Sequence, residues 1–201
     1  KKKVGYWMPV DQYIGGAEHA VGHLIYARFF TRFLRDLKLL DFDEPFARLF
    51  NQGIVYREGA KMSKSLPNVV YQTEISNKYG IDTARFFLMS IASPDKDIEW
   101  SDEGIDGSLR FVKKAFDYVC NVKVGKSNIK IEHKVNLAIK EISKNIENVG
   151  YNFAVIKIRE LIDSLSSEGE ISKKDLDSVV KLISPFCPHI AEELWERIGG
   201  K

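Results

Sequence analysis

The spacing of apolar positions changes near residue 104 and divides the chain into two parts. Before this point, short runs of strand-forming residues alternate with Gly-rich turns and helical segments. One run, Tyr13-Ile14, stops at Gly15-Gly16, and another covers 49–56. Between them, residues 19–37 place apolar side chains three and four positions apart, as on one face of an α-helix. A strand, a helix and a strand in this order predict a βαβ unit with a parallel sheet.

Helical patterns dominate after residue 104. They predict four segments, over 105–122, 132–149, 153–166 and 173–198. We predict Asn152 and Ser172 as N-caps, and we expect Pro185 and Pro188 to break the last segment in two. Short connections between amphipathic helices predict an antiparallel bundle. The fold class is therefore α/β followed by all-α.

Two shorter helices are predicted ahead of the bundle, over 75–79 and 83–91, with Asp82 as the N-cap of the second. Near the end of the chain, Phe186, Ile190, Leu194 and Trp195 are spaced to form a core stripe. His189 beside them is interpreted as a packed or capping residue.

Composition narrows the class of protein only in part. Apolar residues make up 44%, which is enough for a core. No apolar run reaches the length of a membrane helix, and no signal-type region follows the N-terminal lysines. We therefore expect a soluble cytoplasmic protein with no membrane partner. Cys120 and Cys187 are expected to be free, buried thiols. The net charge of +2 neither shows nor excludes a basic face for nucleic acid.

The segment Lys61-Met62-Ser63-Lys64-Ser65 places two lysines three positions apart in a short polar loop. Transfer of an adenylyl group from ATP builds negative charge on the leaving pyrophosphate, and mobile ammonium groups stabilise that charge as it develops. Small residues let backbone N–H groups approach phosphate oxygens. An arbitrary pair of lysines is more often a solvated loop. This pentapeptide, however, resembles the signature of class I aminoacyl-tRNA synthetases.

A second motif joins Gly15-Gly16 to Glu18-His19. Glycines and unpaired helix N–H groups let a ligand contact the backbone, and an acidic residue can accept hydrogen bonds from a ribose. A lone Gly-Gly pair also fits an ordinary strand–turn–helix, with Glu18 as a partner of the helix dipole. His23 shares a helix face with His19, but no third ligand accompanies them. We therefore expect no metal site, and we interpret His23 as a packing residue.

The longer string 9–20, together with His23, Tyr26 and Arg28-Phe29, resembles leucyl-tRNA synthetases. The segment 183–195 resembles the closing helix of the bundle in leucyl, isoleucyl and valyl enzymes. The resemblance implies that Lys61 and Lys64 are catalytic and that Tyr13 and His19 lie near the leucine pocket. It also implies the ATP-binding set Gly15, Gly16, Glu18, Met62, Ser63 and Lys64.

By the same resemblance, residues 1–104 form the second half of a Rossmann catalytic domain with its connecting segment, and 105–201 an anticodon-binding-type bundle. The implied reaction activates leucine with ATP, accompanied by Mg²⁺, and transfers it to tRNA(Leu). The family's first catalytic motif and the early strand for the substrate amino group do not occur in the sequence. We therefore expect the missing N-terminal half of the enzyme as a partner, and no charging activity from this chain alone.

Two alternatives stay open. The chain can derive from an isoleucyl, valyl or methionyl enzyme, although Glu18-His19 in place of an Asp-Gln pair argues against this. It can also be a non-catalytic tRNA-binding module. Four lysines of the bundle either contact RNA phosphates or only solvate a face, namely Lys113, Lys114, Lys123 and Lys126. The absence of an initiator methionine favours an excised fragment over a natural subunit.

Overall fold

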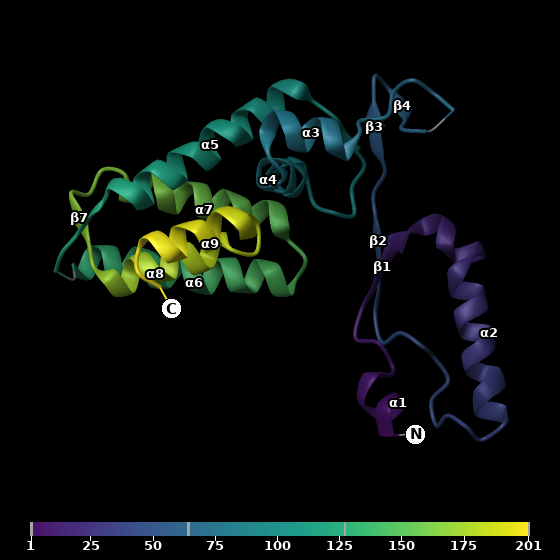
Figure 1. Cartoon of the computed structure of the whole chain (residues 1–201). Helices are drawn as coiled ribbons and strands as arrows, with labels where there is room; N and C mark the ends of the chain where they lie inside the picture. The colour runs from purple at the N-terminus through teal and green to yellow at the C-terminus, as the bar shows by residue number, and fades with distance from the viewer. Residues whose placement is uncertain (1, 64, 127, 201) are drawn as a thin grey trace. The chain divides into compact units, whose positions relative to one another are not determined.

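Figure 1 shows the computed structural model, which describes residues 2–63, 65–126 and 128–200. The chain forms two compact units. The first comprises Lys1–Ile54 and Asp95–Asp97, and the second Val55–Pro94 and Ile98–Lys201. The predicted synthetase signature around Lys61 therefore belongs to the same unit as the helical bundle. The division at residue 104 stays a prediction about the domains of the parent protein.

The first unit confirms the predicted βαβ arrangement. Its elements are α1 (Lys2–Trp7), β1 (Tyr13–Gly16), the 3₁₀ helix η1 (Ala17–Val21), α2 (His23–Asp36) and β2 (Leu49–Gln52). Strands β1 and β2 pair in parallel, from Tyr13 opposite Leu49 to Gly16 opposite Gln52. The single helix predicted over 19–37 is wrong at its start, because Gly22 has non-helical backbone angles and separates η1 from α2.

The apolar side chains of this unit are mostly exposed. Among its described residues only Thr31 and Pro45 are buried. Helix α2 turns Thr31 inward and leaves Ile25, Phe29 and Phe33 on its outer side, 53%, 69% and 48% exposed. Arg28 and Arg32 fix the following loop to α2 by binding Glu44, and these hydrogen bonds lower the pKa of Glu44 to about 2. The unit has little core of its own within the described residues.

The second unit begins with a small sheet and continues as helices. Its elements are β3 (Val55–Arg57), β4 (Ala60–Lys61), α3 (Gln72–Tyr79), α4 (Ile81–Ile91), β5 (Ile98–Glu99), α5 (Asp102–Asn121), β6 (Lys123–Val124), α6 (Ile129–Glu147), α7 (Tyr151–Leu165), β7 (Glu170–Ile171), α8 (Lys173–Ile183) and α9 (Pro188–Arg197). Strand β3 pairs antiparallel with β4 and parallel with β5, and β6 pairs in parallel with β7.

The strand predicted over 49–56 is wrong as one element, because it is divided at Gly53 into β2 and β3, which lie in different sheets. A Cβ at Gly53 would lie 2.0 Å from the carbonyl oxygen of Lys96. The backbone of 95–97 therefore approaches Gly53 more closely than any other residue type allows. At Gly53, residues 49–56 therefore contact the backbone of 95–97 and do not continue as one strand.

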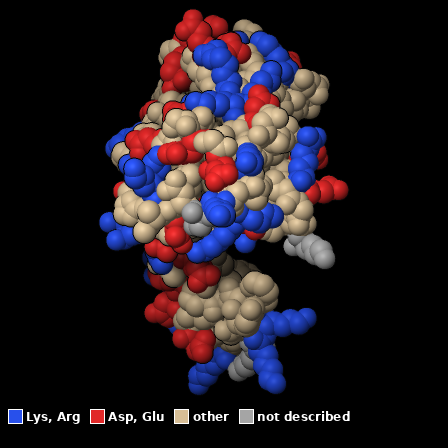
Figure 2. Space-filling model, turned by 90° about the vertical axis from the view of Figure 1, so that its left-hand side faces the viewer, with Lys and Arg blue, Asp and Glu red and all other residues tan. Residues whose placement is uncertain are grey.

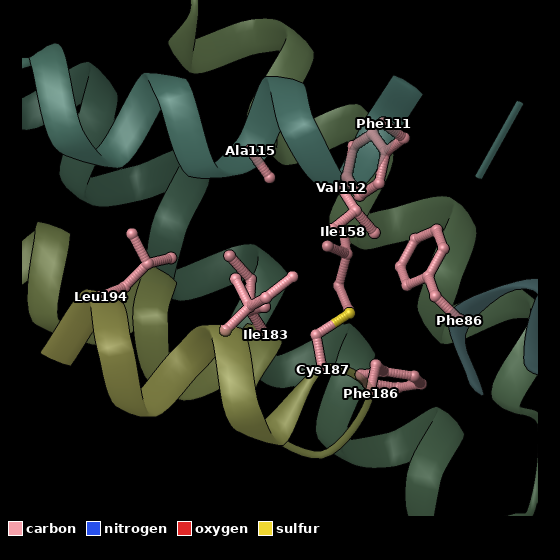
Figure 3. Close-up of a pocket in the computed structure, with 10 residues that line it drawn as sticks. Phe86, Phe111, Val112, Ala115, Ile158, Ile183, Phe186, Cys187 and Leu194 are labelled. Carbon is pink, nitrogen blue, oxygen red and sulfur yellow. The ribbon is translucent and has the colours of Figure 1, made fainter. Parts of the chain in front are cut away.

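The main core of the second unit is formed by buried residues of α4, α5, α6, α7, α8 and α9. Phe86, Phe111, Ile158, Ile183 and Leu194 line a residual void of about 10 Å³. Figure 3 shows these side chains on the helices that carry them. All five are at most 7% exposed. The guanidinium of Arg159 lies over two of these rings, 5.0 Å from the centroid of Phe86 and 4.7 Å from that of Phe111. Helix α4 therefore contributes Phe86 to the core of the bundle, whereas Tyr79 of α3 packs with Ala84, Phe87 and Ile105 in a second cluster.

Helix ends test the predicted caps. The break between α8 and α9 and the N-cap Ser172 are confirmed, since Ser172 Oγ accepts from the backbone N–H of Asp175. Asn152 is wrong as an N-cap, because α7 begins one residue earlier and its N-cap is Gly150. Asp82 is also wrong as a local N-cap, since it lies inside α4, whose N-cap is Gly80.

The two cysteines differ in burial. The prediction that Cys120 is buried is wrong, because it is exposed on α5, whereas Cys187 is buried.

Candidate active site

The signature loop leaves the small sheet at a tight hairpin. Glu58 and Gly59 join β3 to β4 and both have positive φ, 57° and 73°, as a two-residue type I′ turn requires. Lys61 ends β4 with its side chain exposed, and the backbone N–H of Met62 donates to Val55 O at 3.3 Å. The sequence around Lys61 is thus presented at one end of a short antiparallel ladder. Lys64, the second predicted catalytic lysine, lies outside the described residues.

Asn68 holds this loop together from inside. It is 8% exposed. Its Nδ2 donates to the carbonyl oxygens of Ala60 and Lys61, both at 3.3 Å, and its Oδ1 accepts from the backbone N–H of Ser63 at 3.3 Å. The side-chain amide of Asn68 therefore hydrogen-bonds with backbone groups at both ends of the segment from Ala60 to Ser63. Asn68 is not among the predicted site residues, although an amide three positions after the pentapeptide is a visible signal.

Ser63 has its hydroxyl engaged within the loop. Ser63 Oγ and Ser65 Oγ are hydrogen-bonded at 2.8 Å, and the backbone N–H of Leu66 donates to Ser63 O at 3.0 Å. Met62 points elsewhere, since it lines a groove of about 470 Å³ between the loop, α3 and α4. The groove is mainly apolar, with Val55, Ile75 and Trp100 among its lining residues. The loop is therefore anchored on both sides, by hydrogen bonds and by an apolar contact surface.

The first unit brings the other predicted site residues to the carboxyl end of β1. A Cβ at Gly16 would lie 2.2 Å from Glu18 Oε2, so the carboxylate of Glu18 folds back over Gly16. A Cβ at Gly15 would lie 3.2 Å from the Tyr13 ring and 3.4 Å from the His19 ring. Both glycines therefore make room for neighbouring site residues. The carboxyl ends of parallel strands are the edge at which α/β sheets bind ligands.

His23 has a contact that the packing interpretation did not anticipate. Its Nδ1 lies 3.0 Å from Tyr13 Oη, within hydrogen-bond distance, and the two rings are stacked with centroids 5.5 Å apart. Phe46 also contacts Tyr13, with centroids 4.4 Å apart, and lies 6.1 Å from the His23 ring, so the three rings form one cluster. Tyr13 is thus held by an imidazole and a phenyl ring. The position of His23 four residues after His19 is the signal that the sequence offers.

The predicted ATP-binding residues are divided between the units. Gly15, Gly16 and Glu18 lie in the first, and Met62 and Ser63 in the second. Within the described residues, no three His, Cys, Asp or Glu side chains come together as a metal site. No helix formed by these residues is long and apolar enough to cross a bilayer.

The four lysines proposed for RNA differ in their surroundings. Lys114 donates to Asp163 at 2.8 Å, and Lys123 lies 3.9 Å from Glu170. Lys113 and Lys126 have no acidic partner among the described residues. On the face drawn in Figure 2, basic and acidic side chains are intermingled over the bundle. On this face, a patch with charge of a single sign therefore does not extend over several helices of the bundle.

Two family models match the chain. The class I tRNA synthetases (I, L, M and V) match residues 3–101, and the anticodon-binding domain of tRNA ligase matches residues 128–201. The leucine–tRNA ligase of Geobacter sp. (strain M21) is 42% identical over 99% of this chain, and that of Fervidobacterium nodosum is 42% identical over 98%. The chain spans about 27% of the length of these relatives.

Solved structures agree. The Agrobacterium radiobacter K84 agnB2 LeuRS, in a ternary complex with tRNA and LeuAMS, matches 95% of this chain and 28% of its own, with a TM-score of 0.84 and 33% identity. Mycobacterium tuberculosis methionyl-tRNA synthetase shares the fold, with a TM-score of 0.75 and 17% identity over all of this chain and 46% of its own. The predicted fold class is confirmed. The chain belongs to the class I tRNA synthetases and corresponds to the part of leucine–tRNA ligases in which the catalytic domain passes into the anticodon-binding domain.

Proposed function

We propose that this chain is the part of a leucine–tRNA ligase that supplies the pyrophosphate-binding loop and one wall of the ATP and leucine sites. The observation that carries the proposal is the loop at Lys61, braced by Asn68, in a chain 42% identical to leucine–tRNA ligases over 99% of its length. The parent enzyme is cytoplasmic. Its remaining partners are leucine, tRNA(Leu) and the N-terminal half of the same enzyme.

In the first step, a carboxylate oxygen of leucine attacks the α-phosphorus of ATP. A new P–O bond forms, the bond to the bridging oxygen breaks, and pyrophosphate leaves with the negative charge. Lys61 and Lys64 stabilise that charge, and Met62 and Ser63 hold the nucleotide against the loop. The phosphates of ATP would carry a coordinated Mg²⁺, which would neutralise part of their charge. In the second step, a terminal ribose hydroxyl of tRNA attacks the leucyl carbonyl, and AMP leaves.

The first unit binds the ribose and the side chain of leucine. Gly15 and Gly16 let the nucleotide approach the backbone, and Glu18 accepts hydrogen bonds from the ribose hydroxyls. Tyr13 and His19 line the leucine pocket beside Gly15. His23 acts one step removed from the substrate, since its contact with the Tyr13 hydroxyl orients that ring. The support for this assignment is the grouping of these side chains at the carboxyl end of β1.

The test mixes the purified chain with a separately expressed N-terminal part of a relative and measures ATP–pyrophosphate exchange. We expect exchange that requires leucine, both parts and Lys64. Lys64→Ala should abolish it, whereas Lys113→Ala, the same change on an exposed bundle position, should not. Exchange from the chain alone would contradict its expected inactivity.

Other outcomes separate the alternatives. Exchange with isoleucine, valine or methionine but not leucine would assign the chain to a sister enzyme. No exchange with any of these amino acids, from parts shown to be folded and associated, would favour a non-catalytic tRNA-binding module. The same preparations then serve for RNA-binding measurements.

A further inference from the structure

The rings of Tyr13, His23 and Phe46 form one cluster beside the proposed leucine pocket. The ring centroid of Phe46 lies 4.4 Å from that of Tyr13 and 6.1 Å from that of His23. A Cβ at Gly15 would lie 3.2 Å from Cε1 of Tyr13 and 3.4 Å from Cδ2 of His19, so both of these rings border Gly15. The ring that borders the proposed pocket therefore also packs against Phe46.

The backbone of Phe46 is fixed against the segment that leads into β1. Val10 and Phe46 form a parallel β-bridge, which continues the register of β1 and β2. Two hydrogen bonds flank this bridge. The backbone N–H of Val10 donates to Pro45 O at 2.9 Å, and the backbone N–H of Ala47 donates to Val10 O at 2.8 Å. Phe46 therefore keeps its place beside the strand that carries the pocket residues.

A carboxylate two positions before Phe46 ties the same loop to α2. Arg28 donates to both oxygens of Glu44, from Nε to Oε2 at 2.7 Å and from Nη2 to Oε1 at 2.8 Å. Arg32 donates a further hydrogen bond to Oε1 at 2.6 Å. A single exposed ion pair contributes little to stability, but a bidentate guanidinium–carboxylate pair fixes one geometry. Glu44 with Arg28 and Arg32 is called the Glu44 clamp below.

Packing of a hydrophobic core does not by itself account for Phe46. Its side chain is half-buried, in a unit whose described residues include only two buried ones. Its ring contacts Tyr13, a predicted pocket residue, and lies near His23, whose Nδ1 is 3.0 Å from Tyr13 Oη. The clamped loop therefore brings a phenyl ring to the side chains that are expected to meet the substrate.

We propose that Phe46, held in place by the Glu44 clamp, is a positioning residue that sets how far the Tyr13 ring reaches over the leucine pocket. This inference rests on the proposed function, which places Tyr13 beside the leucine side chain. The reach of the ring determines how well leucine is discriminated from its isomer isoleucine, whose side chain branches one carbon nearer to the backbone. Apolar pockets discriminate by about 10- to 200-fold per methylene, so a small shift of one wall has a measurable effect.

The test measures ATP–pyrophosphate exchange with leucine and with isoleucine, in the chain reconstituted with the N-terminal part of a relative. Phe46→Ala should lower the ratio of kcat/KM for leucine to that for isoleucine about 10-fold. The loss should appear mainly as a higher KM for leucine, because Tyr13 meets the substrate side chain away from the reacting atoms. The KM for ATP should change less than about 2-fold, since the proposed ribose contact is made by Glu18, outside the ring cluster.

Graded variants separate positioning from loss of fold. Phe46→Tyr keeps the ring and should retain the discrimination, whereas Phe46→Leu keeps an apolar side chain without the ring and should give an intermediate ratio. Glu44→Ala should lower the ratio roughly 3-fold, because the loop is less firmly held. Asp43→Ala is the matched control. It removes the neighbouring ion pair of the same loop, between Asp43 and Arg35 at 2.6 Å, and should leave the ratio unchanged.

Three results would overturn the proposal. An unchanged ratio in Phe46→Ala, with exchange intact, would exclude a role of Phe46 in discrimination. A parallel rise of the KM for leucine and for ATP in Phe46→Ala and Phe46→Leu would show that this side chain only supports the fold of the first unit. Equal ratios in Glu44→Ala and Asp43→Ala would exclude the clamp. Absence of leucine-dependent exchange from the unsubstituted parts would instead overturn the proposed function, so the two failures are distinguishable.

Discussion

The carboxylate of Asp82 in α4 lies 2.9 Å from His189 Nδ1 and accepts a 2.7 Å hydrogen bond from the backbone N–H of Ile190 in α9. Asp82 is 4% exposed, whereas the side chain of His189 is 73% exposed. A helix leaves its first N–H groups without internal partners, and here one is satisfied from another helix. Arg85 adds a second connection by donating to Pro185 O at 3.1 Å. Helix α4 is thereby fixed to the start of α9 at the end of the bundle.

Removing this carboxylate should destabilise the second unit. Asp82→Ala leaves the partly buried Ile190 N–H without an acceptor and should lower the free energy of unfolding by about 2 kcal/mol. Asp82→Asn should cost less, because an amide oxygen still accepts from Ile190. His189→Ala should cost less than about 1 kcal/mol, since an exposed partner is lost. Urea denaturation followed by helical circular dichroism measures all three, and equal losses for Asp82→Ala and His189→Ala would contradict the assignment.

The prediction of Asp82 as a local N-cap shows where sequence reasoning ends. An Asp near the start of a helix indicates capping. Asp82, however, caps α9 through Ile190, which lies 108 positions later in the chain, and not its own helix. The parallel pairing of β1 and β2 was predictable because periodicity and Gly-rich turns act locally. The contact of His23 with Tyr13 and the approach of Lys96 to Gly53 depend on tertiary structure. No spacing rule reports them.

Asn68 should control catalysis through the shape of the loop. Asn68→Ala removes the bonds to Ala60, Lys61 and Ser63, so Lys61 is no longer held in one geometry. Small displacements of catalytic groups strongly lower the reaction rate. We therefore expect kcat for leucine-dependent exchange in the reconstituted enzyme to fall about 10- to 100-fold. The KM for leucine should change little, because the leucine pocket that we propose lies in the first unit.

Two variants test this account of the loop. Asn68→Asp retains the acceptor for Ser63 N–H but loses both donors, so an intermediate rate is expected. Asn77→Ala, an exposed amide on α3, should leave exchange unchanged. A wild-type kcat in Asn68→Ala would show that the loop keeps its geometry without this brace.

Burial of Cys187 should make the unit sensitive to alkali. Burial raises the pKa of the Cys187 thiol to about 12, from 9.0 when exposed, and the nearby Asp82 adds to the shift. The folded state therefore favours the neutral thiol. The stabilisation of the folded state by the buried neutral thiol is fully present below about pH 9. It is lost as the pH rises toward 12, at up to about 1.4 kcal/mol per pH unit.

Denaturation between pH 8 and 11 at roughly unit steps measures this loss. Cys187→Ala should flatten the alkaline slope, whatever its effect at neutral pH. Tyr118, whose pKa burial also raises to about 12, should maintain part of the slope. A thiol reagent at pH 8 should label Cys120 and spare Cys187, because the first is exposed and the second is 2% exposed. If the free energy of unfolding falls with pH as steeply in Cys187→Ala as in the unsubstituted chain, the Cys187 thiol does not cause the sensitivity to alkali.

The outer face of α2 should decide whether the chain assembles with the rest of the enzyme. Ile25, Phe29 and Phe33 lie one helical turn apart, and together they expose a continuous apolar stripe. Phe29→Asp places a charge in the middle of this stripe. Because Phe29 is 69% exposed, the change should leave the folded chain as stable as before, but it should weaken binding of the N-terminal part at least 10-fold, since a charge buried in an apolar interface is costly.

Size-exclusion co-elution and leucine-dependent exchange give independent readouts of this association. Phe153→Asp is the matched control, because Phe153 is 56% exposed on α7 of the second unit and should be silent in both measurements. If Phe29→Asp co-elutes normally but exchange is lost, the face acts in catalysis and not in assembly. If both readouts stay at wild-type levels, the N-terminal part binds elsewhere on the first unit, and the exposed strand residues Ile14 and Leu49 become the next positions to substitute.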